Sequence, residues 1–107
     1  MNKDIKEKFL KHMQEHVREI SVCEKQIQKE RFDDIRGRHV LSHIHKVAGL
    51  CLTFDFKEQG SIARYVEMRL EKALKSDSSY EIKEVGVLVK NLLKACCELM
   101  DGMKSTT

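Results

Sequence analysis

The chain of 107 residues contains no proline and no tryptophan, and only five of its residues are glycine. Proline and glycine build the frequent turns of all-β proteins, so their scarcity argues against that architecture. Charged residues make up 35% of the sequence, which suits helices with solvated faces. The composition therefore predicts an all-α protein, and the length predicts a single domain over residues 1–107.

Long apolar runs and a strong excess of one charge are also missing. No run approaches the roughly 18 apolar residues that a membrane span needs, and residues 1–8 are rich in charge, unlike a secretory signal. The net charge of +3 comes from 20 basic and 17 acidic residues that are evenly mixed along the chain. We therefore expect a cytoplasmic monomer with no membrane and no nucleic-acid partner.

Motifs for self-contained catalysis are absent as well. The sequence has no glycine-rich phosphate loop, no Gly-x-Ser-x-Gly elbow and no His-Glu-x-x-His, so we expect no enzyme with its own nucleotide or metal site. The cysteines have no Cys-x-x-Cys spacing and lie in or beside apolar stripes, where free cysteine acts as a small hydrophobe. The residues predicted to be reduced core cysteines are Cys23, Cys51, Cys96 and Cys97.

Apolar residues recur at steps of three or four along four segments, which is the period of an amphipathic helix. The first segment covers residues 4–28, and the second runs from Asp34 or Arg38 to Phe54. The predicted inner face of the third segment comprises Ile62, Val66, Leu70 and Ala73. That of the fourth segment comprises Ile82, Val85, Val89, Leu92, Cys96, Leu99 and Met103.

Sequence signals at helix ends support this division. Asp55 with Glu58, and Ser78 with Glu81, resemble capping boxes that open the third and fourth helices. Gly102 is a candidate C-cap of the fourth helix. Four such helices bury their apolar stripes most simply as an antiparallel up-down four-helix bundle, and an N-terminal helical extension of the first helix stays open.

The second predicted helix carries three histidines, His39, His43 and His45. If the stripe over residues 40–54 faces inward, a rotation of about 100° per residue turns His45 about 140° away from the core, toward solvent. Gly49 lies one turn further in nearly the same direction, where glycine costs about 1 kcal/mol relative to alanine. Either a partner approaches His45 closely, or Gly49 permits tight packing of helices within the chain.

An apolar flank adjoins His45 on the predicted helical wheel, about 80–120° from the inward direction. It is a candidate partner surface, although its apolar side chains could equally pack against a neighbouring helix. Lys46 and Arg38 are the predicted cations nearest to His45. The residues of the candidate partner surface are Leu41, Ser42, Ala48 and Leu52.

A known family shares this pattern. The segment His45-Lys46-Val47-Ala48-Gly49, followed by Thr53-Phe54 and Phe56, resembles the phosphorylation motif of histidine phosphotransfer (HPt) domains, many of which read His-Lys-Leu-Ala-Gly and then Thr-Phe-Gly-Phe. The resemblance covers about residues 41–74. It departs at Leu52 and Asp55, where those domains usually have glycine, and at Gln59, where leucine is usual.

The resemblance implies a phosphorelay intermediate of two-component signalling, in which His45 accepts and donates a phosphoryl group. Lys46 or Arg38 could then contribute to holding the phosphoryl oxygens. The expected partners are the receiver domain of a response regulator and a hybrid sensor histidine kinase. The acidic pocket of the receiver would supply Mg²⁺, so the chain itself needs no cofactor. Imidazole is largely unprotonated near neutral pH, which leaves one ring nitrogen free to attack phosphorus.

Two other classes of function remain open at this point. A helical bundle could bind a metal ion, since the pairs His39–His43 and His12–His16 are each spaced i, i+4 on one helix. Two ligands on a face are too few for a metal site, which argues against this class. The departures from the HPt pattern motivate the other class, a helical adaptor that binds a receiver or kinase but accepts no phosphoryl group.

Overall fold

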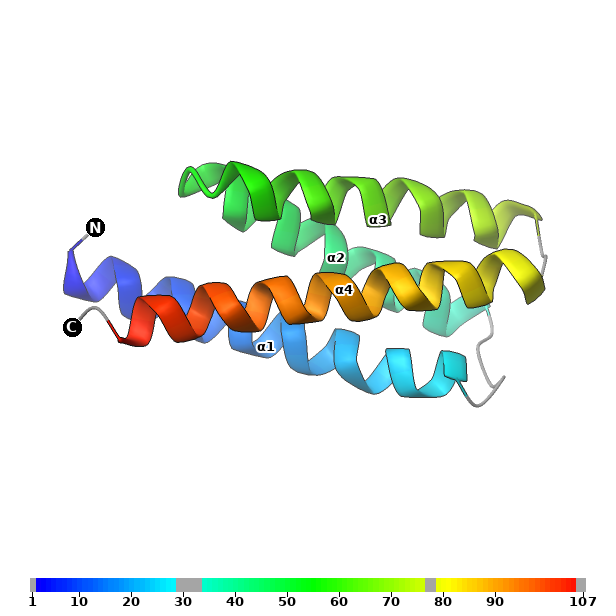
Figure 1. Cartoon of the computed structure of the whole chain (residues 1–107), viewed down its shortest axis with the longest axis horizontal. Coiled ribbons are helices and arrows are strands. Elements are labelled where there is room, and N and C mark those ends of the chain that lie inside the picture. Colours follow the sequence, from blue (N-terminus) through cyan, green and yellow to red (C-terminus); the bar gives the residue numbers. More distant parts are fainter. Residues whose placement is uncertain (1, 29–33, 77–78, 106–107) are drawn as a thin grey trace.

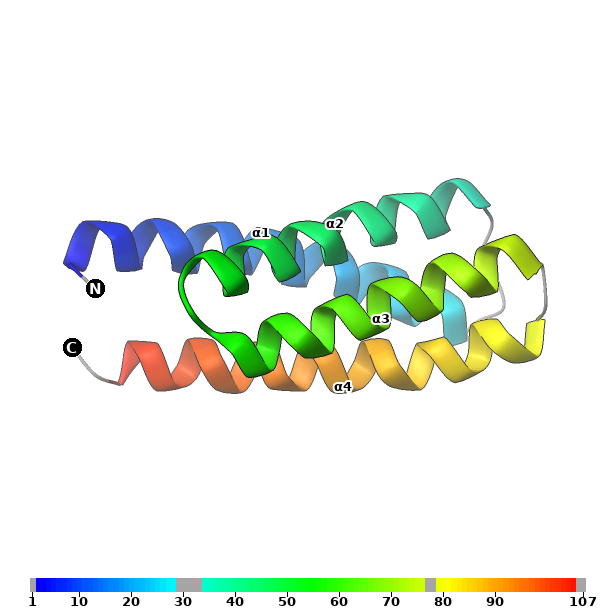
Figure 2. The ribbon, with the colours of Figure 1, turned by 90° about the horizontal axis from the view of Figure 1, so that it is seen from above.

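The computed structural model describes residues 2–28, 34–76 and 79–105. Its helices are α1 (Lys3–Gln28), α2 (Asp34–Thr53), α3 (Lys57–Ser76) and α4 (Ser79–Lys104). Successive helices run antiparallel and pack against each other, and α4 returns to lie beside α1 (Figure 1, Figure 2). The described residues contain no strand. The predicted all-α, antiparallel up-down four-helix bundle is therefore confirmed.

The helices differ in length, which shapes one end of the bundle. α1 and α4 have 26 residues each, whereas α2 and α3 have 20. As a result, the beginning of α1 and the end of α4 project together beyond the connection between α2 and α3 (Figure 2). The N-terminal extension is a continuation of α1 and not a separate helix.

One hydrophobic core joins all four helices, as the apolar periodicity predicts. Cys23, Cys51 and Cys96 are buried in or against it, and burial raises the pKa of Cys51 to about 11 and that of Cys96 to about 12, so both stay thiols at neutral pH. Cys97 is exposed, and its prediction as a core residue was wrong. Since Cys96 takes the inward position on α4, the next side chain is turned about 100° away from the core.

The connection between α2 and α3 is closed by the backbone. The amide of Phe56 donates to the carbonyl of Cys51 at 2.7 Å, and the amide of Asp55 donates to that of Leu52 at 3.2 Å. With its φ of 66°, Asp55 thus occupies the left-handed position of a Schellman motif that ends α2. The predicted capping box of Asp55 and Glu58 was wrong, because an N-cap needs an extended backbone. Asp55 holds a conformation that normally favours glycine, the residue usual here in the HPt pattern.

Three aromatic rings brace this connection against α1. The ring of Phe9 lies 5.1 Å from that of Phe54 and 5.3 Å from that of Phe56, measured between centroids. These separations are within the range in which aromatic pairs attract each other. Phe9 is almost fully buried. The turn between α2 and α3 is therefore tied to the core as well as closed by hydrogen bonds.

The signals predicted for the ends of α4 have different outcomes. Ser78 lies outside the described residues, so its capping role stays a prediction. Glu81 accepts a hydrogen bond of 2.6 Å from the hydroxyl of Ser76. Gly102 is not a C-cap, because α4 continues through it to Lys104 and no described glycine has a positive φ.

α2 and α3 approach each other closely at Gly60. A Cβ atom placed on Gly60 would lie 2.7 Å from Cδ2 and 2.8 Å from Cγ of Leu52, which is closer than carbon atoms pack. Leu52 of α2 therefore rests against the bare backbone of α3. The HPt pattern usually has glycine at position 52, and here a glycine on the facing helix makes room for the leucine instead.

We expect Asp55→Gly to raise the free energy of unfolding by about 0.5–1 kcal/mol, because glycine adopts the left-handed conformation without steric cost. The side chain of Asp55 is exposed and lies 3.8 Å from Lys57, an ion pair that contributes little. Asp55→Ala should instead lower the free energy of unfolding by about 1 kcal/mol, because alanine adopts the left-handed conformation at a steric cost. Urea denaturation followed by circular dichroism measures the free energy of unfolding of both variants. Equal effects of the two variants would contradict the left-handed conformation of Asp55.

The glycines on α2 and α3 offer a matched test of the close approach. Among the described residues, no atom lies within 4 Å of a Cβ placed on Gly49, so Gly49→Ala should stabilise the chain by about 0.5–1 kcal/mol. Gly60→Ala should instead destabilise it, since overpacking costs about 1–3 kcal/mol. In a Leu52→Ala background Gly60→Ala should become neutral or stabilising. A coupling energy near zero between positions 52 and 60 in this double-mutant cycle would disprove the contact.

Candidate functional site

His45 projects from the middle of α2 into solvent, as its position on the predicted wheel required. Its side chain is 67% exposed. The Nδ1 atom lies 2.7 Å from Oε2 of Glu67 on α3, and the Glu67 side chain is only 21% exposed. The imidazole is therefore held through one nitrogen on a side chain that is mostly exposed.

Glu67 is a site residue that the sequence analysis missed. His45 stands seven residues before Leu52 on α2, and Glu67 stands seven residues after Gly60 on α3. Seven residues make about two helical turns, so on two antiparallel helices the close approach of Leu52 and Gly60 aligns the other pair as well. No signal within α2 or α3 alone identifies Glu67, because the pairing depends on the register between them.

The contact with Glu67 assigns different roles to the two ring nitrogens. A carboxylate accepts hydrogen bonds and does not donate them, so a neutral His45 binds Glu67 by donating its Nδ1 proton. The proton on Nδ1 leaves Nε2 with a free lone pair. A carboxylate that fixes the tautomer and orientation of an imidazole in this way is the arrangement found in catalytic triads.

Gly49 is exposed, and the space beside it is open. No atom of the described residues lies near enough to require a missing side chain, so tight packing among these helices does not explain this glycine. One turn of α2 separates Gly49 from His45, on the same face of the helix. The bare backbone beside the imidazole therefore leaves room for something outside the described chain.

The candidate partner surface is only partly exposed. Ser42 is exposed and Leu52 is 37% exposed, while Leu41 is half-buried against the core. Ala48 is 1% exposed, so its assignment to a partner surface was wrong. α2 contacts both α1 and α3. A helix between two neighbours buries side chains over a wider part of its circumference than a single apolar stripe, and Ala48 falls within that part.

The predicted cations do not surround His45. Arg38 lies about 10 Å before it along the helix axis, and its Nε donates to Asp34 at 3.3 Å. Lys46 is exposed, and its charge acts on His16 and His43, on the α1 side of α2. The side chains of both cations would therefore have to move to reach a phosphoryl group on His45.

A second group of polar side chains lies between α1 and α2. The Nδ1 atoms of His16 and His43 are 2.9 Å apart, and Nε2 of His39 lies 3.1 Å from Oε2 of Glu19. The rings of His39 and His43 meet edge to face at 4.6 Å. Burial, together with neighbouring positive groups, lowers the pKa of both His16 and His43, so the neutral imidazole is favoured there.

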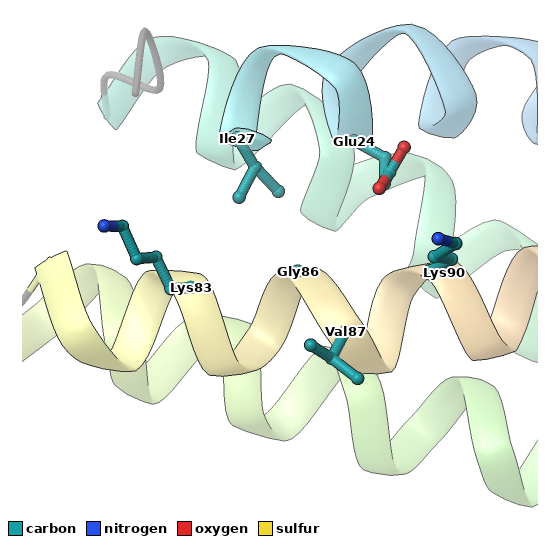
Figure 3. A pocket seen from close by; sticks show the side chains of 6 residues that line it. All are labelled: Glu24, Ile27, Lys83, Gly86, Val87 and Lys90. Atoms are coloured by element: carbon teal, nitrogen blue, oxygen red, sulfur yellow. The ribbon is translucent and has the colours of Figure 1, made fainter. Parts of the chain in front are cut away.

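A surface hollow of about 290 Å³ lies between α1 and α4, on the edge of the bundle opposite to α2 and α3. In Figure 3, Ile27 of α1 points toward α4 near Gly86, and Lys83 and Lys90 flank the two ends. The methyl group of Ile27 would be 3.0 Å from a Cβ on Gly86, so this glycine accommodates the isoleucine. The hollow is remote from His45.

Comparisons with known proteins give no further assignment. No protein-family model, no curated protein and no solved structure was found to match the chain. No helix in the described ranges combines the length and the apolar character needed to cross a membrane. The geometry at His45 and at the neighbouring side chains is therefore the basis for assigning a function.

Proposed function

We propose that the chain is a phosphotransfer protein of the HPt type, which accepts and donates a phosphoryl group at Nε2 of His45. One observation carries the proposal: an exposed imidazole whose Nδ1 is bound by Glu67, with a bare helix backbone beside it at Gly49. A partner of two-component signalling, acting in the cytoplasm, is the source and acceptor of the group. The chain has the role of a carrier and not of an enzyme with its own nucleotide site.

The transfer itself follows from the orientation of the ring. The Nε2 lone pair forms a bond to phosphorus while the bond between phosphorus and the aspartyl oxygen of the partner breaks, and the partner aspartate leaves as a carboxylate. The Nδ1 proton stays on the ring, which becomes positively charged. Glu67 accepts the hydrogen bond from that proton and stabilises the charge, and the reverse transfer restores the neutral ring.

The partner supplies the rest of the chemistry. Phosphoryl transfer requires alignment of the reacting groups and neutralisation of the oxygens, which Mg²⁺ and a lysine in the acidic pocket of a receiver domain provide. His45 must enter that pocket, so the surface around it has to be open and free of bulk. Gly49 meets this need, and Ser42 with the exposed part of Leu52 forms the edge of the docking surface. Lys46 and Arg38 would have to move their side chains to contact the phosphoryl oxygens.

A label-transfer assay tests the proposal. Receiver domains carrying a radiolabelled phosphoryl group are mixed with the wild-type chain, and we expect an acid-labile label on wild type and none on His45→Gln. Glu67→Gln should slow transfer by about 10–100-fold, because the carboxylate that fixes the tautomer of His45 and stabilises its positively charged ring is lost. His12→Gln, an exposed histidine on α1, is the matched control and should transfer at the wild-type rate.

The assay separates the proposal from the adaptor alternative. An adaptor of this fold would bind a receiver without taking up label. If the wild-type chain binds labelled receivers but takes up label from none of them, His45 is excluded as a phosphoryl acceptor. Equal labelling of wild type and His45→Gln would place the modification on another residue.

Gly49 allows docking to be tested apart from the imidazole. We expect Gly49→Gln to lower the rate of transfer from phosphorylated receiver at least about tenfold, because a side chain there obstructs the approach to His45. The same variant should not reduce the stability of the free chain, since the space beside Gly49 is open. Transfer rates and urea midpoints measure the two effects. An unchanged transfer rate would show that no partner approaches this face.

A further inference from the structure

The group between α1 and α2 contains the parts of a metal site. Glu19, His39 and His43 each offer one ligand atom, and these three atoms lie within 4.8 Å of one another. The sequence offered His39 and His43 only as a pair on one helix face, and two ligands are too few to hold a metal ion. α1 adds the carboxylate, and the residues thus come from two helices that the core holds together.

One separation within the group is close to that between two ligands of a bound zinc ion. Zinc bound tetrahedrally at about 2.0–2.1 Å from each ligand places any two ligand atoms about 3.3 Å apart. Nε2 of His39 and Oε2 of Glu19 are 3.1 Å apart. The side chains of His39 and Glu19 are 52% and 42% exposed, so they are free to adjust by small rotations when an ion enters.

The group also has a supporting contact. Nδ1 of His16 lies 2.9 Å from Nδ1 of His43, so the hydrogen bond between them leaves Nε2 of His43 available as a ligand. A metal-bound histidine commonly has its other nitrogen held in this way. Imidazole and carboxylate ligands together suit zinc, copper and nickel better than magnesium or calcium.

We propose that Glu19, His39 and His43 bind a divalent transition-metal ion of the zinc class, with His16 positioning His43 and one coordination position left open. This site is separate from the phosphoryl acceptor, because His43 and His45 differ by about 200° around α2. Two histidines and one glutamate with an open fourth position are a known ligand set for zinc. Water or a side chain of another protein fills the open position.

Zinc titration of the full chain without a polyhistidine tag tests the site. We expect one zinc ion per chain in wild type, measured by competition with a chromophoric chelator, and a rise in the unfolding temperature on zinc addition. His39→Gln and Glu19→Gln should each weaken binding more than tenfold, and His16→Phe by about 10-fold. His12→Gln is the matched control, because this histidine lies on the same helix outside the group, and it should bind zinc as wild type does.

Zinc binding is expected not to depend on the phosphoryl acceptor, His45. The titration is repeated with His45→Gln, which removes the His45–Glu67 pair, and we expect the same stoichiometry and affinity. A wild-type chain that takes up no zinc, or a His39→Gln chain that binds it as tightly as wild type, would overturn the proposal. Zinc binding that is lost in His45→Gln and retained in Glu19→Gln would move the metal to the other site and would equally overturn it.

Discussion

The close contact between Leu52 and the bare backbone at Gly60 sets the register of α2 against α3. Because this register is fixed, the two helices also meet two turns away, where Nδ1 of His45 lies 2.7 Å from Glu67. The Schellman motif at Asp55 and the aromatic rings around it hold the connection between the helices in place. The orientation of the imidazole thus depends on an apolar contact that is not itself part of the site.

α2 serves two surfaces at once. Toward α3 it presents His45, and toward α1 it presents His39 and His43. Both surfaces pair an imidazole with a carboxylate from the neighbouring helix, but they differ in what the pair leaves available. At His45 a single ring is bound through one nitrogen, whereas at the other surface three candidate ligand atoms lie within 4.8 Å of one another. Group transfer at the first surface and metal binding at the second are the two functions that we propose.

Two glycines show why residue type alone does not reveal a role. Gly49 and Gly60 both lie within helices, and each lowers helix stability by a comparable amount. Gly60 accommodates Leu52, so its role is internal packing, whereas Gly49 has open space beside it. Of these two glycines, Gly49 is therefore the one that leaves room for an approach from outside the chain.

Helical periodicity in the sequence was sufficient to predict four helices, one shared core and the exposure of His45, because the direction of a side chain within a helix depends on local geometry alone. Glu67 and Glu19 could not be predicted as partners, since the contact between two helices depends on their register and on which helices are neighbours. The same limit explains Ala48, which lies at the edge of the apolar stripe and is buried because α2 has a neighbour on each side. The sequence by itself determined which way each side chain points from its own helix. The tertiary structure decided what it meets there, because packing fixes the distances between helices.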